Sequence, residues 1–277
     1  MTHVFRSAHV LLIALAFAAL PSASAQPAVE EPLDRVLAGV VGADGRVDHA
    51  RLASRYQDDL DAALTAVARQ DPKALRSDDQ KTAFLINAYN AQVLARVLAS
   101  PGARNLERQD LFDEFFQRPV RVAGQAMTLD QLEHGVLRRQ SRVDGAAVPA
   151  RLRSLRPSRV DYRIHAALNC AAVSCPPLQR RAFRASTLDR DLGAAFSAFA
   201  ASPRAARLDG RRLVLSSLFD WFASDFEAGG RLVGDVIIGA GGGRSAAIRS
   251  RLASQSAASL RRDDAVRFEY DWTVNRR

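Results

Sequence analysis

The chain has 277 residues, of which 48% are hydrophobic, so it can bury a normal core in one large or two small domains. Its formal net charge is +9, and the basic residues concentrate at 138–142 and 151–159. Those stretches contain no groove-reading motif and no aromatic residues interleaved with basic ones, which argues against nucleic-acid binding. We expect solvated arginine surfaces with, at most, weak contact to anionic envelope surfaces.

The N-terminus has the pattern of a cleavable signal peptide. Arg6 precedes an apolar run over 8–20, and Ala23-Ser24-Ala25 has the small-x-small form of a cleavage site. We expect cleavage near Ala25-Gln26, a periplasmic or secreted protein, and no transmembrane segment in the mature chain. The expected organisation is a signal peptide over 1–25, a Pro/Glu-rich lead-in over 26–45, and one domain over 46–277.

The rest of the chain predicts a mixture of helices and strands. Asp44-Gly45 predicts a turn, and apolar residues at helical spacing predict helices over 52–67, 78–99, 128–139 and 187–202. Apolar or alternating runs predict a strand with a turn at Gly124, and further strands over 160–170, 211–216 and 265–275. Helices and strands do not alternate regularly. The predicted class is therefore α+β, a single compact domain with a small, largely antiparallel sheet.

Two amides lie on the apolar face of the predicted helix over 78–99. Asn87 and Asn90 are one turn apart, within an arc that includes Ile86 and Val97. Each would need hydrogen bonds if buried, because an unsatisfied buried polar group costs about 1–3 kcal/mol. Two interpretations stay open: the amides tie the helix to a neighbouring loop, or one of them orients a catalytic group.

A carboxylate interrupts the apolar face of the next predicted helix, over 128–139. Glu133 projects between Leu129 and Leu137, and His134 lies at the margin of the same face. A carboxylate on a core face needs a cationic or hydrogen-bonding partner, or its pKa rises. Both outcomes are typical of functional sites, and a structural ion pair is the alternative.

The stretch IHAALNCAAVSCPPL contains both cysteines of the chain, Cys170 and Cys175, and begins just before His165. The two cysteines could form a disulfide, which suits an exported protein. One of them, preferably Cys170, could be a nucleophile, with His165 or His134 as its base. Glu133, Asn87 or Asn90 would then orient the histidine. The third interpretation is a metal site that would add Glu133 or His134, but the cysteine spacing is loose for zinc.

Four motifs resemble, in order, those of the domain-of-unknown-function family 547: FLINAYNA, TLDQLEHGVLR, HAALNCAAVSCPPL and YDWTVN. The resemblance extends from about Val47 to Asn275. It implies a shared fold and names no reaction. The resemblance implies that the motif positions of the family correspond here to Asn87, Tyr89, Asn90, Glu133, His134, His165, Cys170 and Cys175.

The sequence thus predicts that Asn87, Asn90, Glu133, His165 and the cysteines converge on one polar centre. That centre would support thiol-dependent acyl transfer or hydrolysis of a small-molecule or peptide substrate, in the manner of papain or transglutaminase, without a cofactor or a metal. The alternative is a non-enzymatic envelope module that contains a Cys170–Cys175 disulfide.

Overall fold

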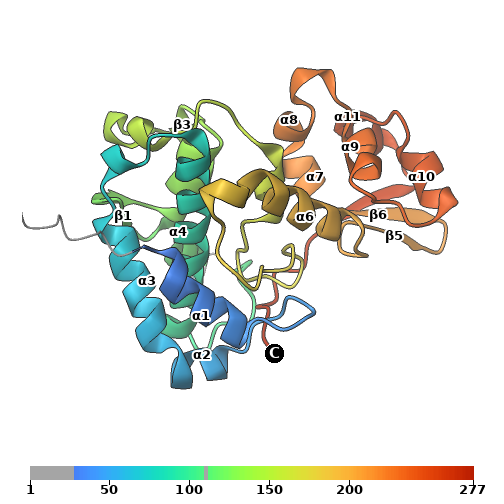
Figure 1. The fold of residues 1–277 in the computed structure, drawn as a ribbon. Helices are drawn as coiled ribbons and strands as arrows, with labels where there is room; N and C mark the ends of the chain where they lie inside the picture. The colour runs from blue at the N-terminus through green and yellow to red at the C-terminus, as the bar shows by residue number, and fades with distance from the viewer. Residues whose placement is uncertain (1–27, 109–111) are drawn as a thin grey trace, which may run out of the picture.

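The computed structural model describes residues 28–108 and 112–277, so the predicted signal peptide lies outside the described residues. The chain folds into two adjoining parts (Figure 1), and each part contains a hydrophobic cluster. One is built around helices α1 to α4 and the other around the strands and short helices of the C-terminal part. Helix α6, Leu188–Ala200, joins them, because Leu188 and Leu192 pack in the first cluster while Phe196 and Phe199 pack in the second.

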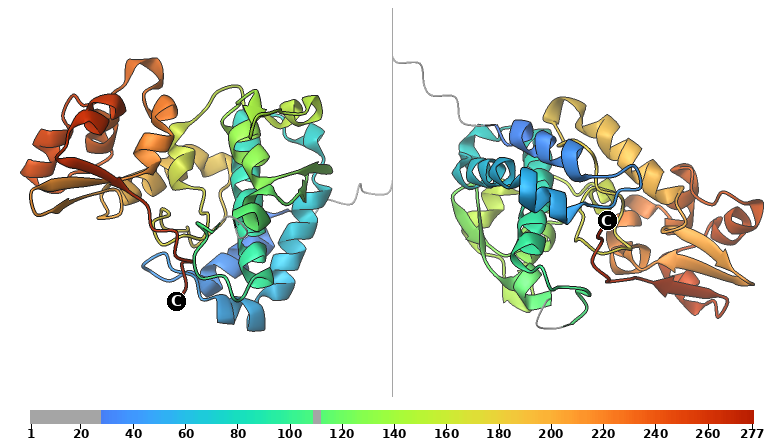
Figure 2. Two further views of the ribbon diagram at one scale, coloured as in Figure 1. Left: turned by 180° about the vertical axis from the view of Figure 1, so that it is seen from behind. Right: turned by 90° about the horizontal axis from the view of Figure 1, so that it is seen from below.

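Helix α4, Asp78–Ala99, is the central helix of the first cluster, as Figure 2 shows from behind and from below. Its N-terminus is a capping box: the Ser77 hydroxyl accepts a hydrogen bond from the Gln80 backbone N–H, and the Gln80 side-chain oxygen accepts one from the Ser77 N–H. Residues on nearly all of its sides are buried, including Arg96, whose guanidinium donates to the Arg118 carbonyl. The predicted helix over 78–99 is confirmed, and it is more fully enclosed than a one-sided amphipathic helix.

The stretch expected as a lead-in includes helix α1, Glu30–Val40. Leu33 and Val36 are completely buried in the first cluster. The folded core therefore begins before residue 46. The predicted turn at Asp44-Gly45 is present, with Gly45 at φ +73° and packed against Pro177.

The strands form three small sheets. Two are antiparallel hairpins, β1 with β2 and β3 with β4, and the third has the order β5-β6-β7. In the third sheet β5 pairs antiparallel with β6, and β6 pairs parallel with β7. The α+β class with small, largely antiparallel sheets is confirmed.

The predicted strand over 160–170 is wrong. Its central part is a turn of 3-10 helix, η5, Tyr162–Ala166, with Asp161 capping the Arg163 N–H. The predicted C-terminal strand is confirmed only for β7, Val266–Glu269. Beyond it the chain returns to the first cluster, and single bridges tie it to Val47, Asn105 and Ala172.

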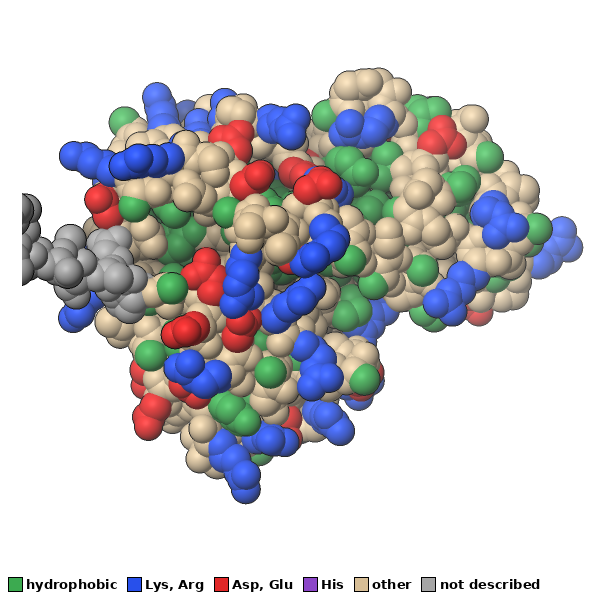
Figure 3. All heavy atoms as spheres, in the orientation of Figure 1, with side chains coloured by type: hydrophobic (Ala, Val, Ile, Leu, Met, Phe, Trp, Pro, Cys, Tyr) green, Lys and Arg blue, Asp and Glu red, His purple; other side chains and the backbone are tan. Residues whose placement is uncertain are grey.

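Basic side chains on the face drawn in Figure 3 are spread out, with acidic ones between them.

Among the described residues, no helix has the length and apolar character needed to cross a bilayer. The remaining helices and strands have the following bounds: α2 His49–Arg55, α3 Gln57–Arg69, η1 Pro72–Ala74, η2 Asp113–Gln117, β1 Val120–Val122, β2 Gln125–Met127, η3 Gln131–Leu137, β3 Arg142–Val143, β4 Ala146–Ala147, η4 Ala150–Leu155, η6 Ala185–Thr187, β5 Ala206–Asp209, β6 Arg212–Ser216, α7 Leu218–Trp221, α8 Ala223–Phe226, η7 Ala228–Gly230, α9 Val233–Gly239, α10 Ala246–Leu252 and α11 Ala257–Arg262.

Candidate active site

A cavity of about 330 Å³ lies where the two hydrophobic clusters meet. Its walls come from α4, η3, the cysteine loop, α7 and the segment after β7. Five of the seven residues selected from the sequence line it, namely Glu133, His134, His165, Cys170 and Cys175.

Asn87 and Asn90 do not line the cavity. Asn87 donates to the Phe183 carbonyl at 2.8 Å and accepts from the Phe183 N–H at 2.9 Å. Asn90 donates to the Ala167 carbonyl and accepts from the Asn169 N–H, both at 2.9 Å. Both amides are therefore structural ties, and Asn90 holds the backbone that joins His165 to the cysteine loop.

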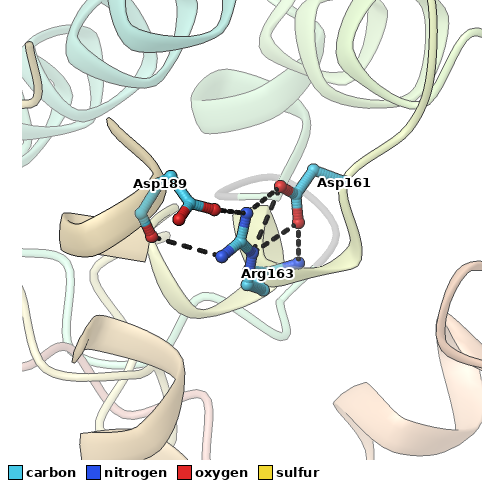
Figure 4. Close-up of polar contacts among 3 residues, drawn as sticks. All are labelled: Asp161, Arg163 and Asp189. Atoms are coloured by element: carbon cyan, nitrogen blue, oxygen red, sulfur yellow. Dashed lines mark hydrogen bonds and ion pairs between the residues drawn. The ribbon is translucent and has the colours of Figure 1, made fainter. Parts of the chain in front are cut away.

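His165 is 3% exposed, and its position is fixed from several sides. The preceding residues are held by Arg163, which donates to Asp161 and Asp189 and so ties η5 to α6 (Figure 4). The imidazole stacks on Phe222 with ring centroids 3.9 Å apart, and its Nε2 lies 2.9 Å from Asp225 Oδ2. Its Nδ1 is buried without a hydrogen-bond partner among the described residues. Burial lowers the pKa of His165, despite the opposing hydrogen bond to Asp225.

Asp225 connects His165 to a buried cation. Arg138 Nε donates to Asp225 Oδ2 at 2.5 Å, and another nitrogen of the same guanidinium lies 3.0 Å from His134 Nδ1. Burial alone would raise the pKa of Asp225, but its hydrogen bonds with His165 and Arg138 outweigh that effect and lower the pKa to about 2. Asp225 is therefore ionised and suited to hold the His165 proton on Nε2, which leaves the Nδ1 lone pair free.

The cysteine loop brings the two sulfurs together. Asn169 shapes the loop by donating to the Pro176 carbonyl and accepting from the Ala171 N–H, each at 2.9 Å. Ala171 has φ +68°, a conformation that is strained for alanine. The Cys170 and Cys175 Sγ atoms are 2.6 Å apart, and both cysteines are free.

Both sulfurs also contact the Tyr270 hydroxyl, at 3.1 Å for Cys170 and 3.2 Å for Cys175. Burial opposes ionisation of Cys175, but hydrogen bonds from the Cys170 thiol, the Tyr270 hydroxyl and the Cys170 N–H outweigh it and lower the Cys175 pKa. The pKa of Cys170 is well above its ordinary value, because its thiol donates to Cys175 and is buried. The pair is therefore predisposed to hold one proton and one negative charge.

Two further carboxylates line the cavity. The Glu133 carboxylate has no hydrogen bond or ion pair with the residues that the structure describes. Asp130 accepts a hydrogen bond from Gln117, and its pKa is raised to about 7 by burial and by the charges of Glu133, Asp144 and Asp113. The described residues contain no group of three or more side chains arranged to hold a metal ion.

Sequence reasoning missed Asp130, Arg138, Asp225 and Tyr270. Tyr270 and Trp272 are two residues apart in the predicted strand over 265–275, and their side chains do lie together, but β7 ends before them. Asp225 lies in the aromatic-rich segment LFDWFASDF, which contains a second acid, Asp220, and no local pattern shows which of the two faces the site. Nothing local to Arg138 identifies its partner 87 residues away.

Residues 72–200 match the family model described as "Protein of unknown function, DUF547". The match contains all seven residues selected from the sequence, but it ends before Asp225 and Tyr270. No curated protein and no solved structure matches the chain.

Proposed function

We propose that this chain, a member of the DUF547 family over residues 72–200, is an exported enzyme that carries out thiol-dependent acyl transfer or hydrolysis in the cavity. Export is inferred from the N-terminal sequence pattern. The chemistry is inferred from one observation above all: a proton-sharing thiol pair and an imidazole with a free, buried Nδ1 line the same cavity.

Cys170 is the proposed nucleophile. It is the more exposed of the two sulfurs, while Cys175 is 1% exposed. Transfer of the Cys170 proton to Cys175 would leave Cys170 as the thiolate that attacks a carbonyl carbon. The acyl group then moves to Cys170, and the leaving group departs with the proton held by Cys175. Activation by a second cysteine differs from the papain arrangement, because neither sulfur hydrogen-bonds to an imidazole in the described structure.

His165 is the proposed base for the second half of the reaction. Because its pKa is lowered, the imidazole is neutral near pH 7, and Asp225 favours the tautomer with the proton on Nε2. The free Nδ1 can then accept a proton from the water or acceptor that attacks the acyl-enzyme. Asp225 and Arg138 act as positioning residues.

The second candidate is a binding or structural module in which Cys170 and Cys175 form a disulfide. The 2.6 Å separation of the sulfurs favours it, since little movement is needed to bring them to bonding distance. The two candidates differ in the state of the unreduced protein, because an active thiol enzyme must contain free thiols.

Reaction with an activated acyl donor tests the proposal. The reduced chain is mixed with p-nitrophenyl acetate and with a small thioester, and its intact mass is followed together with product release. We expect a single acyl adduct on Cys170, absent in Cys170→Ser, and an adduct that persists longer in His165→Gln. An unmodified protein, or equal turnover by Cys170→Ser, would contradict the assignment.

A further inference from the structure

The cavity contains more negative than positive charge, although the whole chain has a net charge of +9. Arg138 is the one Lys or Arg among the described lining residues, and its charge is balanced by Asp225. With His165 neutral, Glu133 and Asp130 remain without a cationic partner among the described residues.

One wall of the cavity is a group of three stacked or tilted aromatic rings. Trp221 lies 4.8 Å from Tyr270 and 5.7 Å from Trp272, and Tyr270 and Trp272 are 4.7 Å apart, all measured between ring centroids. Trp221 is 46% exposed, which is unusual for so large an apolar side chain outside a binding surface.

We infer that this cavity binds an organic cation, an alkylammonium group held between the Trp221–Tyr270–Trp272 wall and the Glu133 carboxylate. Aromatic faces attract ammonium groups through the ring quadrupole, and they do so more strongly where water is excluded. A carboxylate without a protein partner supplies the opposite charge. His165 also lines this cavity and has a buried Nδ1 without a hydrogen-bond partner among the described residues.

The inference names a substrate class for the proposed acyl transfer, namely a donor or acceptor with an amine or quaternary ammonium group, and to that extent it rests on the proposed function. Cation binding itself needs no thiol. Experiments can therefore contradict the cation site without contradicting the acyl transfer, and the reverse.

Trp221 and Trp272 are the only tryptophans in the sequence, so intrinsic tryptophan fluorescence reports directly on this wall. The purified chain is titrated with choline and with 3,3-dimethyl-1-butanol, which has nearly the same shape and no charge. We expect saturable quenching by choline and binding of the alcohol that is at least about tenfold weaker. Equal affinity for the two compounds, or no response to choline, would overturn the inference.

Glu133→Gln tests whether the Glu133 charge binds the cation, and Glu31→Gln, at an exposed position of helix α1, is the matched control. We expect Glu133→Gln to weaken choline binding about tenfold without changing that of the alcohol, and Glu31→Gln to behave as the parent protein. Unchanged choline binding by a folded Glu133→Gln would contradict the role of Glu133. The same titration on Cys170→Ser separates the two proposals: choline binding there, combined with no acyl adduct on the parent protein, upholds the cation site and removes the chemistry.

Discussion

His165 and Asp225 lie 60 residues apart in the chain and meet at 2.9 Å, where the two hydrophobic clusters adjoin. The imidazole comes from the turn η5 and the carboxylate from the short helix α8. Arg138 reaches the same carboxylate from η3, so three distant segments are joined by one buried oxygen. The site and the packing of the two clusters therefore depend on the same contacts.

Removing Arg138 should destabilise the fold strongly. Arg138→Gln leaves Asp225 ionised and partly buried without its cation, and breaking a buried pair in this way costs about 3–5 kcal/mol. Urea unfolding measures the loss. Arg138→Gln combined with Asp225→Asn should recover part of the stability, because the unpaired charge is then gone; a double variant as unstable as the sum of the single variants would argue against the pair.

Asn90 and Asn87 should differ in their effect on the thiols. Each Asn→Ala change leaves a buried carbonyl and a buried N–H unpartnered, and each such group costs about 1–3 kcal/mol. Only Asn90 holds the backbone next to the cysteine loop. Asn90→Ala should therefore alter the alkylation rate of Cys170 in folded protein, while Asn87→Ala should destabilise the fold and leave that rate unchanged.

Tyr270→Phe should make the thiol pair less reactive. The Tyr270 hydroxyl contacts both sulfurs, and its hydrogen bond lowers the pKa of Cys175, so its loss raises the pH at which the pair ionises. We expect alkylation at pH 7 to slow about tenfold. A rate equal to that of the parent protein would show that the hydroxyl does not stabilise the thiolate.

His49 should make the fold less stable in mild acid. Burial lowers its pKa to about 4, so below the unfolded pKa of about 6.5 the unfolded chain binds a proton that the folded chain rejects. This group contributes full stability above pH 6.5 and loses it as the pH falls toward 4, about 2 kcal/mol between pH 7 and pH 5. Urea unfolding of His49→Gln at both pH values should show a pH dependence smaller by that amount. An unchanged dependence would contradict the assignment.

The parts of the fold that follow from local pattern could be predicted from the sequence. Helix α4 has a capping box and a long apolar repeat, and α6 has a clear 3.6-residue period. The turn η5 could not, because a short apolar run such as YRIHAAL suits a strand equally well, and the Asp161 cap and the Arg163 bridge to α6 decide the outcome. Helix α1 was missed because Pro32 and the glutamates at its start resemble a linker, although its buried Leu33, Val36, Leu37 and Val40 recur at helical spacing.

The site was predictable to the extent that polar residues interrupt apolar faces. That signal found Glu133 and both asparagines, but it cannot tell a side chain that faces a cavity from one that binds a neighbouring backbone, which is why Asn87 and Asn90 were placed with the cysteines. Asp225 and Tyr270 reach the site through long-range packing, and no nearby pattern marks them.

The most direct test of the central claim is alkylation of the unreduced chain with iodoacetamide across pH, followed by peptide mapping. The account predicts two free thiols, of which Cys170 is the one alkylated at neutral pH, and a rate of Cys170 alkylation that falls when Cys175 is replaced by serine. A chain that resists alkylation until it is reduced, with a mass two protons lower than that of the dithiol, would contradict it and establish the disulfide-bonded module instead.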